Sequence, residues 1–253
     1  MGNDGLMSAL DTWTRGSHTY DETAHPTWRK GTGPGVVLVH EIPGITDAVI
    51  AFAEEVVAAG FTVVMPQLFG EVGGPADLKH VAAVVPRVCI SREFTKLARN
   101  ETTPVAGWLR SLAGDLHAEL GGPGVGALGM CFTGGFALAM MVDDAIAAPV
   151  LCQPSAPFAV GRARAADLNL SPADLEVVRR RAAEGCAVLG LRYRKDPATG
   201  TRFDTLRREL GDGFVAVELE GRGHSTVTEH RQQEAVDRVL AFFREGLQTQ
   251  NVS

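Results

Sequence analysis

The fold of this chain is decided by one stretch, VGALGMCFTGGFALAMM, which occupies residues 125–141. It begins with an apolar run typical of a buried strand, passes through glycines on both sides of Cys131, and continues as a helical pattern. Strand, glycine-flanked nucleophile and helix are the order of a nucleophile elbow, in which a sharp turn lifts the central side chain off the sheet edge. Unpaired N–H groups and the dipole at the helix N-terminus favour a negative charge there. We therefore predict that Cys131 is a nucleophile that reacts as a thiolate.

Short apolar runs alternate with amphipathic stretches on both sides of this elbow. Further strands are expected at residues 35–40, 61–66, 148–152, 187–191 and 214–219, and further helices at 48–60, 105–120, 172–183, 201–210 and 227–243. This alternation predicts a mainly parallel sheet with helices on both faces. We expect one α/β domain over residues 1–253, with loosely ordered ends at 1–18 and 247–253. The long segment 67–100 is expected to form a lid or pocket wall.

The composition excludes several classes of protein. Of the 253 residues, 45% are hydrophobic and 21% charged, which is typical of a folded domain, and the net charge of −6 does not favour nucleic acid or an anionic membrane. No apolar run is long enough to span a bilayer, and no secretory signal is visible, so a cytoplasmic location is expected. The other cysteines, Cys89, Cys152 and Cys186, stand in apolar surroundings and are expected to be buried thiols rather than zinc ligands.

Two later residues complete a catalytic order. In such folds the nucleophile is followed along the chain by an acid and then a histidine, each just after a strand. His224 follows the strand expected to end at residue 219, whereas His18 and His25 lie in the N-terminal segment and His80, His117 and His230 lie in expected helices. Asp196 follows the strand expected to end at residue 191, although Asp204 is an alternative acid. Cys131, Asp196 and His224 would then meet at one edge of the sheet.

The loop after the first strong strand reads HEIPG at residues 40–44. In this fold that loop and the residue after the nucleophile supply backbone N–H groups to an oxyanion hole. The expected donors are the amides of Ile42 and Phe132, and Glu41 would lie beside Cys131. From spacing alone, an exposed loop carboxylate is the alternative interpretation of Glu41.

The loop at 40–44, the elbow at 129–135 and GHS at 223–225 together resemble the dienelactone hydrolase family of the α/β-hydrolase superfamily, over residues 35–243. The resemblance implies an α/β-hydrolase fold and a carboxymethylenebutenolidase-like ester or lactone hydrolase with a Cys131, Asp196 and His224 triad and a thioester intermediate. It implies that Glu41 partners the resting thiol and that Ser225 contacts a substrate carboxylate.

The chain departs from the family pattern at two places. The family has glycine two residues after the nucleophile, where this chain has Thr133, and a β-branched residue is expected to change how the elbow packs. Arg92 is the nearest candidate for the family's carboxylate-binding arginine, although an ion pair at a helix start explains it equally well.

Several alternatives stay open. The chain could be a broad esterase or thioesterase, a promiscuous phosphotriesterase, a thiol redox sensor that oxidises Cys131, or a catalytically silent binding domain. Residues 124–129 match GxGxxG, but they are expected inside a strand, which is the wrong context for a dinucleotide site. We expect no metal or organic cofactor, a small-molecule ester or lactone substrate, and a monomer or small homo-oligomer.

Overall fold

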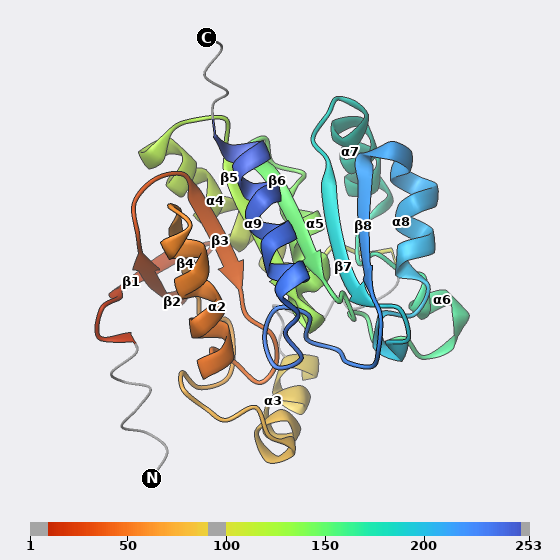
Figure 1. Cartoon of the computed structure of the whole chain (residues 1–253), viewed down its shortest axis with the longest axis horizontal. Helices are drawn as coiled ribbons and strands as arrows, with labels where there is room; N and C mark the ends of the chain where they lie inside the picture. Colours follow the sequence, from red (N-terminus) through yellow and green to blue (C-terminus); the bar gives the residue numbers. More distant parts are fainter. Residues whose placement is uncertain (1–9, 91–99, 249–253) are drawn as a thin grey trace.

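The computed structural model describes residues 10–90 and 100–248. Its eight strands form one sheet in the order β1-β2-β4-β3-β5-β6-β7-β8 (Figure 1). The strands are β1 (Thr14–Tyr20), β2 (Thr23–Lys30), β3 (Gly35–Val39), β4 (Thr62–Pro66), β5 (Val125–Met130), β6 (Ile146–Cys152), β7 (Val188–Tyr193) and β8 (Phe214–Leu219). The helices are α2 (Asp47–Ala58), α3 (Leu78–Ile90), α4 (Val105–Leu120), α5 (Gly134–Met140), α6 (Gly161–Ala165), α7 (Pro172–Ala183), α8 (Arg202–Leu210) and α9 (Gln233–Leu247).

Six of the strands run parallel. β3 to β8 pair in parallel, whereas β1 pairs with β2 and β2 with β4 in antiparallel fashion. The predicted α/β architecture with a mainly parallel sheet is therefore confirmed. Since the parallel strands end at the same edge, the loops after β3, β5, β6, β7 and β8 gather there.

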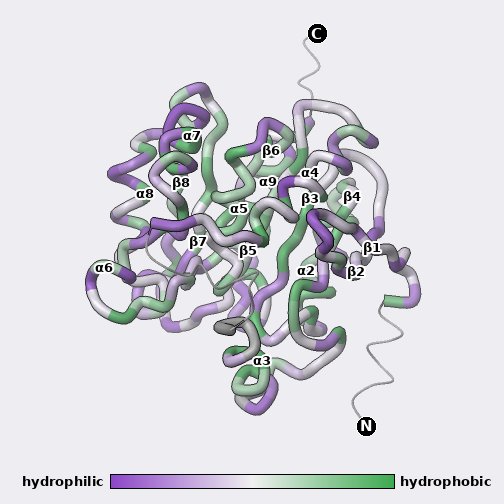
Figure 2. The backbone as a smooth tube through the Cα atoms, turned by 180° about the vertical axis from the view of Figure 1, so that it is seen from behind, coloured by the Kyte–Doolittle hydropathy of each residue, from purple (hydrophilic) through white to green (hydrophobic). Residues whose placement is uncertain are grey.

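Helices cover both faces of the sheet because the strand residues alternate between two cores. In β3, Val36 and Leu38 pack with α2 and α9, whereas Val37 and Val39 face α4 and α5. Figure 1 shows α2 and α9 in front of the sheet, and α7 and α8 complete the second core. Seen from behind, hydrophobic residues gather in the central strands and hydrophilic residues on α7 and α8 (Figure 2).

Two predictions about element boundaries were wrong. Residues 14–18, expected in a loosely ordered end, belong to β1, which was missed because it is a mostly exposed edge strand with no apolar alternation. The turn to β2 has positive φ of 48° at Asp21 and 62° at Glu22. Aspartate is common at the first of these positions, but glutamate stands at the second, where glycine is usual. The last helix begins at Gln233 rather than residue 227, so His230 lies outside it.

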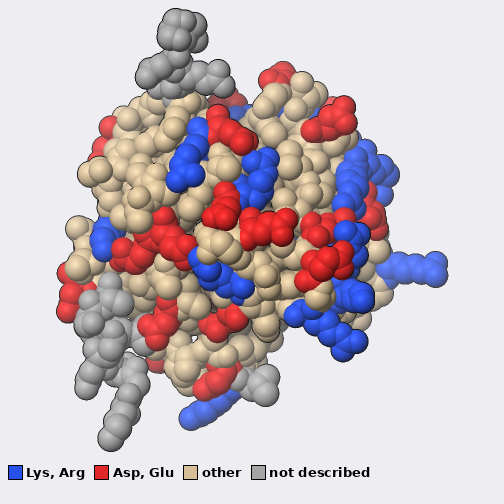
Figure 3. Space-filling view, in the orientation of Figure 1, with Lys and Arg blue, Asp and Glu red and all other residues tan. Residues whose placement is uncertain are grey.

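Charge on the described surface is mixed. In Figure 3, Lys and Arg side chains gather toward the α8 edge, with acidic side chains among them. Ion pairs account for this mixture, for example Arg192 and Arg207 with Glu218, and Arg208 with Glu209. Within residues 10–90 and 100–248, no helix is both long and apolar enough to cross a bilayer.

Candidate active site

Cys131 lies at the turn between β5 and α5. β5 ends at Met130, a 3-10 helix η1 spans Cys131–Thr133, and α5 begins at Gly134. Cys131 has a φ of +54°, a left-handed conformation that costs a non-glycine residue about 1–3 kcal/mol. The chain approaches itself closely here, because a Cβ on Gly129 would lie 2.1 Å from the carbonyl oxygen of Thr133. The sharp turn expected of a nucleophile elbow is therefore present.

Thr133 fastens this turn to the end of β3. Its Oγ1 accepts a hydrogen bond from the Met130 amide at 3.0 Å and lies 3.1 Å from the carbonyl oxygens of both Val39 and His40, toward which it donates. The side chain is fully buried. The threonine that departs from the family pattern therefore couples the elbow to the loop that carries Glu41.

His224 and Asp196 form a hydrogen-bonded pair, with 2.8 Å between His224 Nδ1 and Asp196 Oδ2. The second carboxylate oxygen of Asp196 accepts from the Ala198 amide at 2.9 Å, so Asp196 caps the short helix η2 (Pro197–Thr199). The Asp196 side chain is only 3% exposed. Asp204, the alternative acid, lies in the first turn of α8 with a largely exposed side chain 3.4 Å from Arg207. The geometry thus pairs His224 with Asp196.

The charge state of His224 follows from its neighbours. Burial alone would lower the pKa of the ring, but hydrogen bonds to Asp196 and Cys131, together with their charges, raise it from 6.5 to about 10. The ring therefore carries a proton at neutral pH.

Glu41 is buried and strongly held. Its Oε2 accepts hydrogen bonds from Ser225 Oγ at 2.8 Å and Gln153 Nε2 at 3.4 Å, and its Oε1 accepts from Thr228 Oγ1. Burial raises the pKa of this carboxyl, while the hydroxyls of Thr228 and Ser225 and the charge of His224 oppose the rise. At 4% exposure, Glu41 is not the exposed loop carboxylate of the alternative interpretation.

The other expected site residues differ in how the structure places them. Ile42 lines the same cavity as His224, and Phe132 is fully buried with its ring edge-on to Phe136 at 5.6 Å. Their roles as oxyanion donors stay predictions. The Ser225 hydroxyl donates a hydrogen bond to Glu41, so a contact with a substrate carboxylate would require a rearrangement. Arg92 lies outside the described residues.

A cavity of about 390 Å³ adjoins Glu41, His224 and Ser225. Ala76 and Val81, from the segment expected to form a lid or pocket wall, lie in its lining. The complete lining is Glu41, Ile42, Pro43, Thr46, Ala76, Val81, His224, Ser225, Glu229 and His230.

Sequence reasoning missed the polar residues that connect the site. Gln153 follows β6 and is fully buried, and its Oε1 accepts from the amide and hydroxyl of Thr226 at 3.1 and 2.8 Å. His230 Nδ1 accepts from the amides of His224 and Ser225, both at 3.4 Å. The position of Gln153 directly after a parallel strand was the available signal. Nothing in the helical pattern around His230 indicated its turn.

Two other thiols differ from Cys131 in their surroundings. Burial raises the pKa of Cys152, which is fully buried, and also that of Cys186, which is half-buried rather than buried as predicted. The side chain of Cys89 lies outside the described part of the chain. Cys152 and Cys186 are therefore expected to stay protonated and to react slowly.

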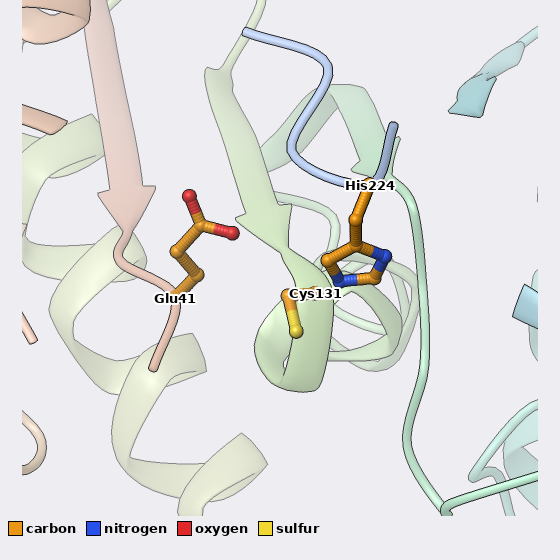
Figure 4. Close-up of side chains that lie close together, drawn as sticks. All are labelled: Glu41, Cys131 and His224. Atoms are coloured by element: carbon orange, nitrogen blue, oxygen red, sulfur yellow. The ribbon is translucent and has the colours of Figure 1, made fainter. Parts of the chain in front are cut away.

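Glu41, Cys131 and His224 could in principle hold a metal ion. Each offers a ligand atom, these atoms lie within 4.8 Å of one another, and they are of the types that zinc binds. The Glu41 carboxylate already accepts hydrogen bonds, however, and Figure 4 shows it pointing away from the sulfur of Cys131. The Glu41 carboxylate is thus already engaged by hydroxyl groups within this cluster.

Comparison with known proteins identifies the family of this chain. The model of the dienelactone hydrolase family matches residues 22–159, more than half of the chain. No curated protein matches the sequence.

Many solved structures share the fold. A dienelactone hydrolase from Anabaena variabilis has 15% identity and a TM-score of 0.62, and the match covers 93% of this chain and 98% of that one. A dienelactone hydrolase-like promiscuous phosphotriesterase from metagenomic libraries has 18% identity and a TM-score of 0.59, with 94% and 99% covered. A cold-adapted esterase from an Arctic intertidal metagenomic library has 16% identity and a TM-score of 0.62, with 92% and 93% covered. The expected α/β-hydrolase fold is confirmed, and the chain belongs to the dienelactone hydrolase family.

Proposed function

We propose that this chain hydrolyses carboxylic esters or lactones, with Cys131 as nucleophile, His224 as base and Asp196 as the acidic residue of the triad, which orients His224. One observation carries the proposal: the ring of His224 is hydrogen-bonded to Asp196 and lies beside Cys131, with a ring nitrogen within 4.8 Å of the sulfur, and Cys131 stands in a strained elbow. A histidine oriented by a carboxylate and placed against a nucleophile is the recurring arrangement of acyl-transfer enzymes.

The first half of the reaction forms a thioester. The Cys131 thiolate attacks the carbonyl carbon, and the carbonyl electron pair moves to the oxygen, which the amides of Ile42 and Phe132 would stabilise. In comparable sites one such donor contributes about 3–4 kcal/mol. The protonated His224 then gives its proton to the leaving alkoxide, and the tetrahedral intermediate collapses to the thioester.

The second half regenerates the thiolate. His224, now neutral, takes a proton from a water molecule that attacks the thioester carbon. The carbon–sulfur bond breaks and the acid product leaves, so that the thiolate again faces a protonated His224. Asp196 holds the ring in one tautomer throughout, because Nδ1 stays bonded to its carboxylate.

Glu41 supports this cycle electrostatically. Its charge favours the protonated form of His224, and its carboxylate lies within 4.8 Å of the sulfur. The family resemblance assigns it a contact with the resting thiol, which would require Glu41 to leave the hydroxyls of Ser225 and Thr228. We propose that substrate binding changes how often Glu41 contacts the thiol and how often it accepts the hydrogen bonds of Ser225 and Thr228.

The test replaces the nucleophile and a matched thiol. Cys131→Ala should abolish hydrolysis of p-nitrophenyl acetate, while Cys186→Ala should keep it, because Cys186 is half-buried beside the carbonyl oxygens of Ile146 and Ala147. Iodoacetamide labelling mapped by mass spectrometry should select Cys131 over Cys152 and Cys186. Turnover in Cys131→Ala would disprove the proposal. Disulfide formation under peroxide in a protein without esterase activity would favour the redox alternative.

The substrate class is tested separately. A panel of enol lactones and p-nitrophenyl esters of increasing chain length would compare lactonase with general esterase activity. The carboxymethylenebutenolidase-like proposal requires the enol lactone to have the larger kcat/KM. A preference for the simple esters would assign the chain to the broad esterase alternative.

A further inference from the structure

Ser155 is a buried hydroxyl directly beside the proposed nucleophile. Its Oγ donates a hydrogen bond to Cys131 Sγ over 3.2 Å, and the residue is only 3% exposed. Its backbone amide donates to the carbonyl oxygen of Cys131 at 2.9 Å. One residue therefore contacts both the reacting sulfur and the backbone of the strained turn that presents it.

The register of the sheet explains this position. Met130 at the end of β5 lies opposite Cys152 at the end of β6. The chain after β6 therefore passes the elbow immediately, and Pro154 packs against the start of α5, where a Cβ on Gly134 would lie 2.6 Å from the Pro154 Cα.

The segment that carries Ser155 is held from both sides. On one side the amide of Gln153 donates to the carbonyl oxygen of Leu191 in β7 at 2.7 Å. On the other side Pro157 accepts a hydrogen bond from the buried guanidinium of Arg202, which also donates to the carbonyl oxygens of Asp167 and Thr199. The backbone that carries Ser155 is thus held in place beside the elbow.

A hydrogen-bond donor beside the sulfur of Cys131 stabilises a negative charge on that atom. The sulfur already faces the hydrogen-bond donor of His224, and a second donor stabilises the thiolate more than the neutral thiol. We propose that Ser155 is a further catalytic residue, which stabilises the Cys131 thiolate by donating a hydrogen bond from its hydroxyl to Sγ. This inference rests on the proposed function, because it assumes that Cys131 is the nucleophile.

Measuring thiolate formation without turnover tests the role of Ser155 separately from the proposed hydrolase activity. The rate of iodoacetamide alkylation of Cys131, followed by mass spectrometry across a pH series, gives the midpoint of ionisation. In Ser155→Ala this midpoint should rise by about one pH unit, so alkylation below the midpoint slows about ten-fold. Ser155→Gly should behave in the same way, which gives a second variant if one of them folds poorly.

Thr103→Val is the matched control. Thr103 Oγ1 is a buried hydroxyl that has no hydrogen-bond partner among the described residues, so its loss should leave the alkylation profile unchanged. An unchanged midpoint in both Ser155 variants overturns the inference, even if their turnover falls, because a purely structural role would produce that result. Turnover in Cys131→Ala would instead overturn the proposed function and leave the alkylation result intact.

Discussion

Replacing Thr133 by valine tests whether the elbow depends on a side chain that the family pattern lacks. Valine has nearly the shape of threonine, so the packing is kept and only the hydroxyl is lost. The Met130 amide, buried and bonded to Thr133 Oγ1 at 3.0 Å, would lose its side-chain acceptor. A buried donor left unpaired costs about 1–3 kcal/mol, and the lost donation to Val39 and His40 about 1 kcal/mol more.

We therefore expect Thr133→Val to lower the free energy of unfolding by about 2–4 kcal/mol, measured by urea titration at neutral pH. For a chain of this length the melting temperature should fall by roughly 4 °C or more. Thr133→Ser keeps the hydroxyl and should stay closer to the wild type. A Thr133→Val protein within about 0.5 kcal/mol of the wild type would refute the reasoning, because surface-like substitutions give changes of that size.

Three further outcomes follow from the site. Asp196→Asn should lower kcat about 10²–10⁴-fold, whereas Asp204→Asn should leave it nearly unchanged, and a larger loss at Asp204 would reassign the acid. Because the pKa of His224 is raised to about 10, its protonation stabilises the fold fully below about pH 6.5, and this contribution is lost as the pH rises through 10. The free energy of unfolding should therefore fall less steeply between these pH values in His224→Gln than in the wild type, and equal slopes would contradict the assignment. Glu41→Gln should lower the free energy of unfolding by about 1–3 kcal/mol in urea titration. The reason is that Ser225 and Thr228 each donate to one carboxylate oxygen, and glutamine replaces one of these oxygens by an NH₂ group, which cannot accept a hydrogen bond. Wild-type stability would show that these contacts contribute little.

The sequence allowed the central part of the fold and the order of the candidate triad to be predicted. Apolar runs mark β3, β4 and β5 because both faces of these strands are buried, which leaves a continuous hydrophobic signal. The rule that parallel strands end at one edge then placed Cys131, Asp196 and His224 together.

Other features depend on contacts between distant residues, which a local sequence pattern does not reveal. β1 is exposed along most of its length, so its formation depends on pairing with β2, which no periodicity reveals. Good helix formers in the segment 225–232 are confined to its second half, at Glu229, Arg231 and Gln232. Thr226 and Thr228 in the first half bond to Gln153 and Glu41, and these tertiary contacts hold the segment in a turn. The contact of Ser155 with the sulfur similarly depends on the alignment of β5 with β6.

The position of Gln153 has a consequence for how the site opens. Its side chain joins Glu41 in the loop after β3 to Thr226 in the loop after β8, and its backbone continues β6. Amide hydrogens exchange with solvent only when their hydrogen bonds open, and groups that share bonds open as one cooperative unit. Three loops from distant parts of the chain are thereby coupled, so the amide of Thr226, although in a loop, should exchange slowly and report the same opening that releases Glu41.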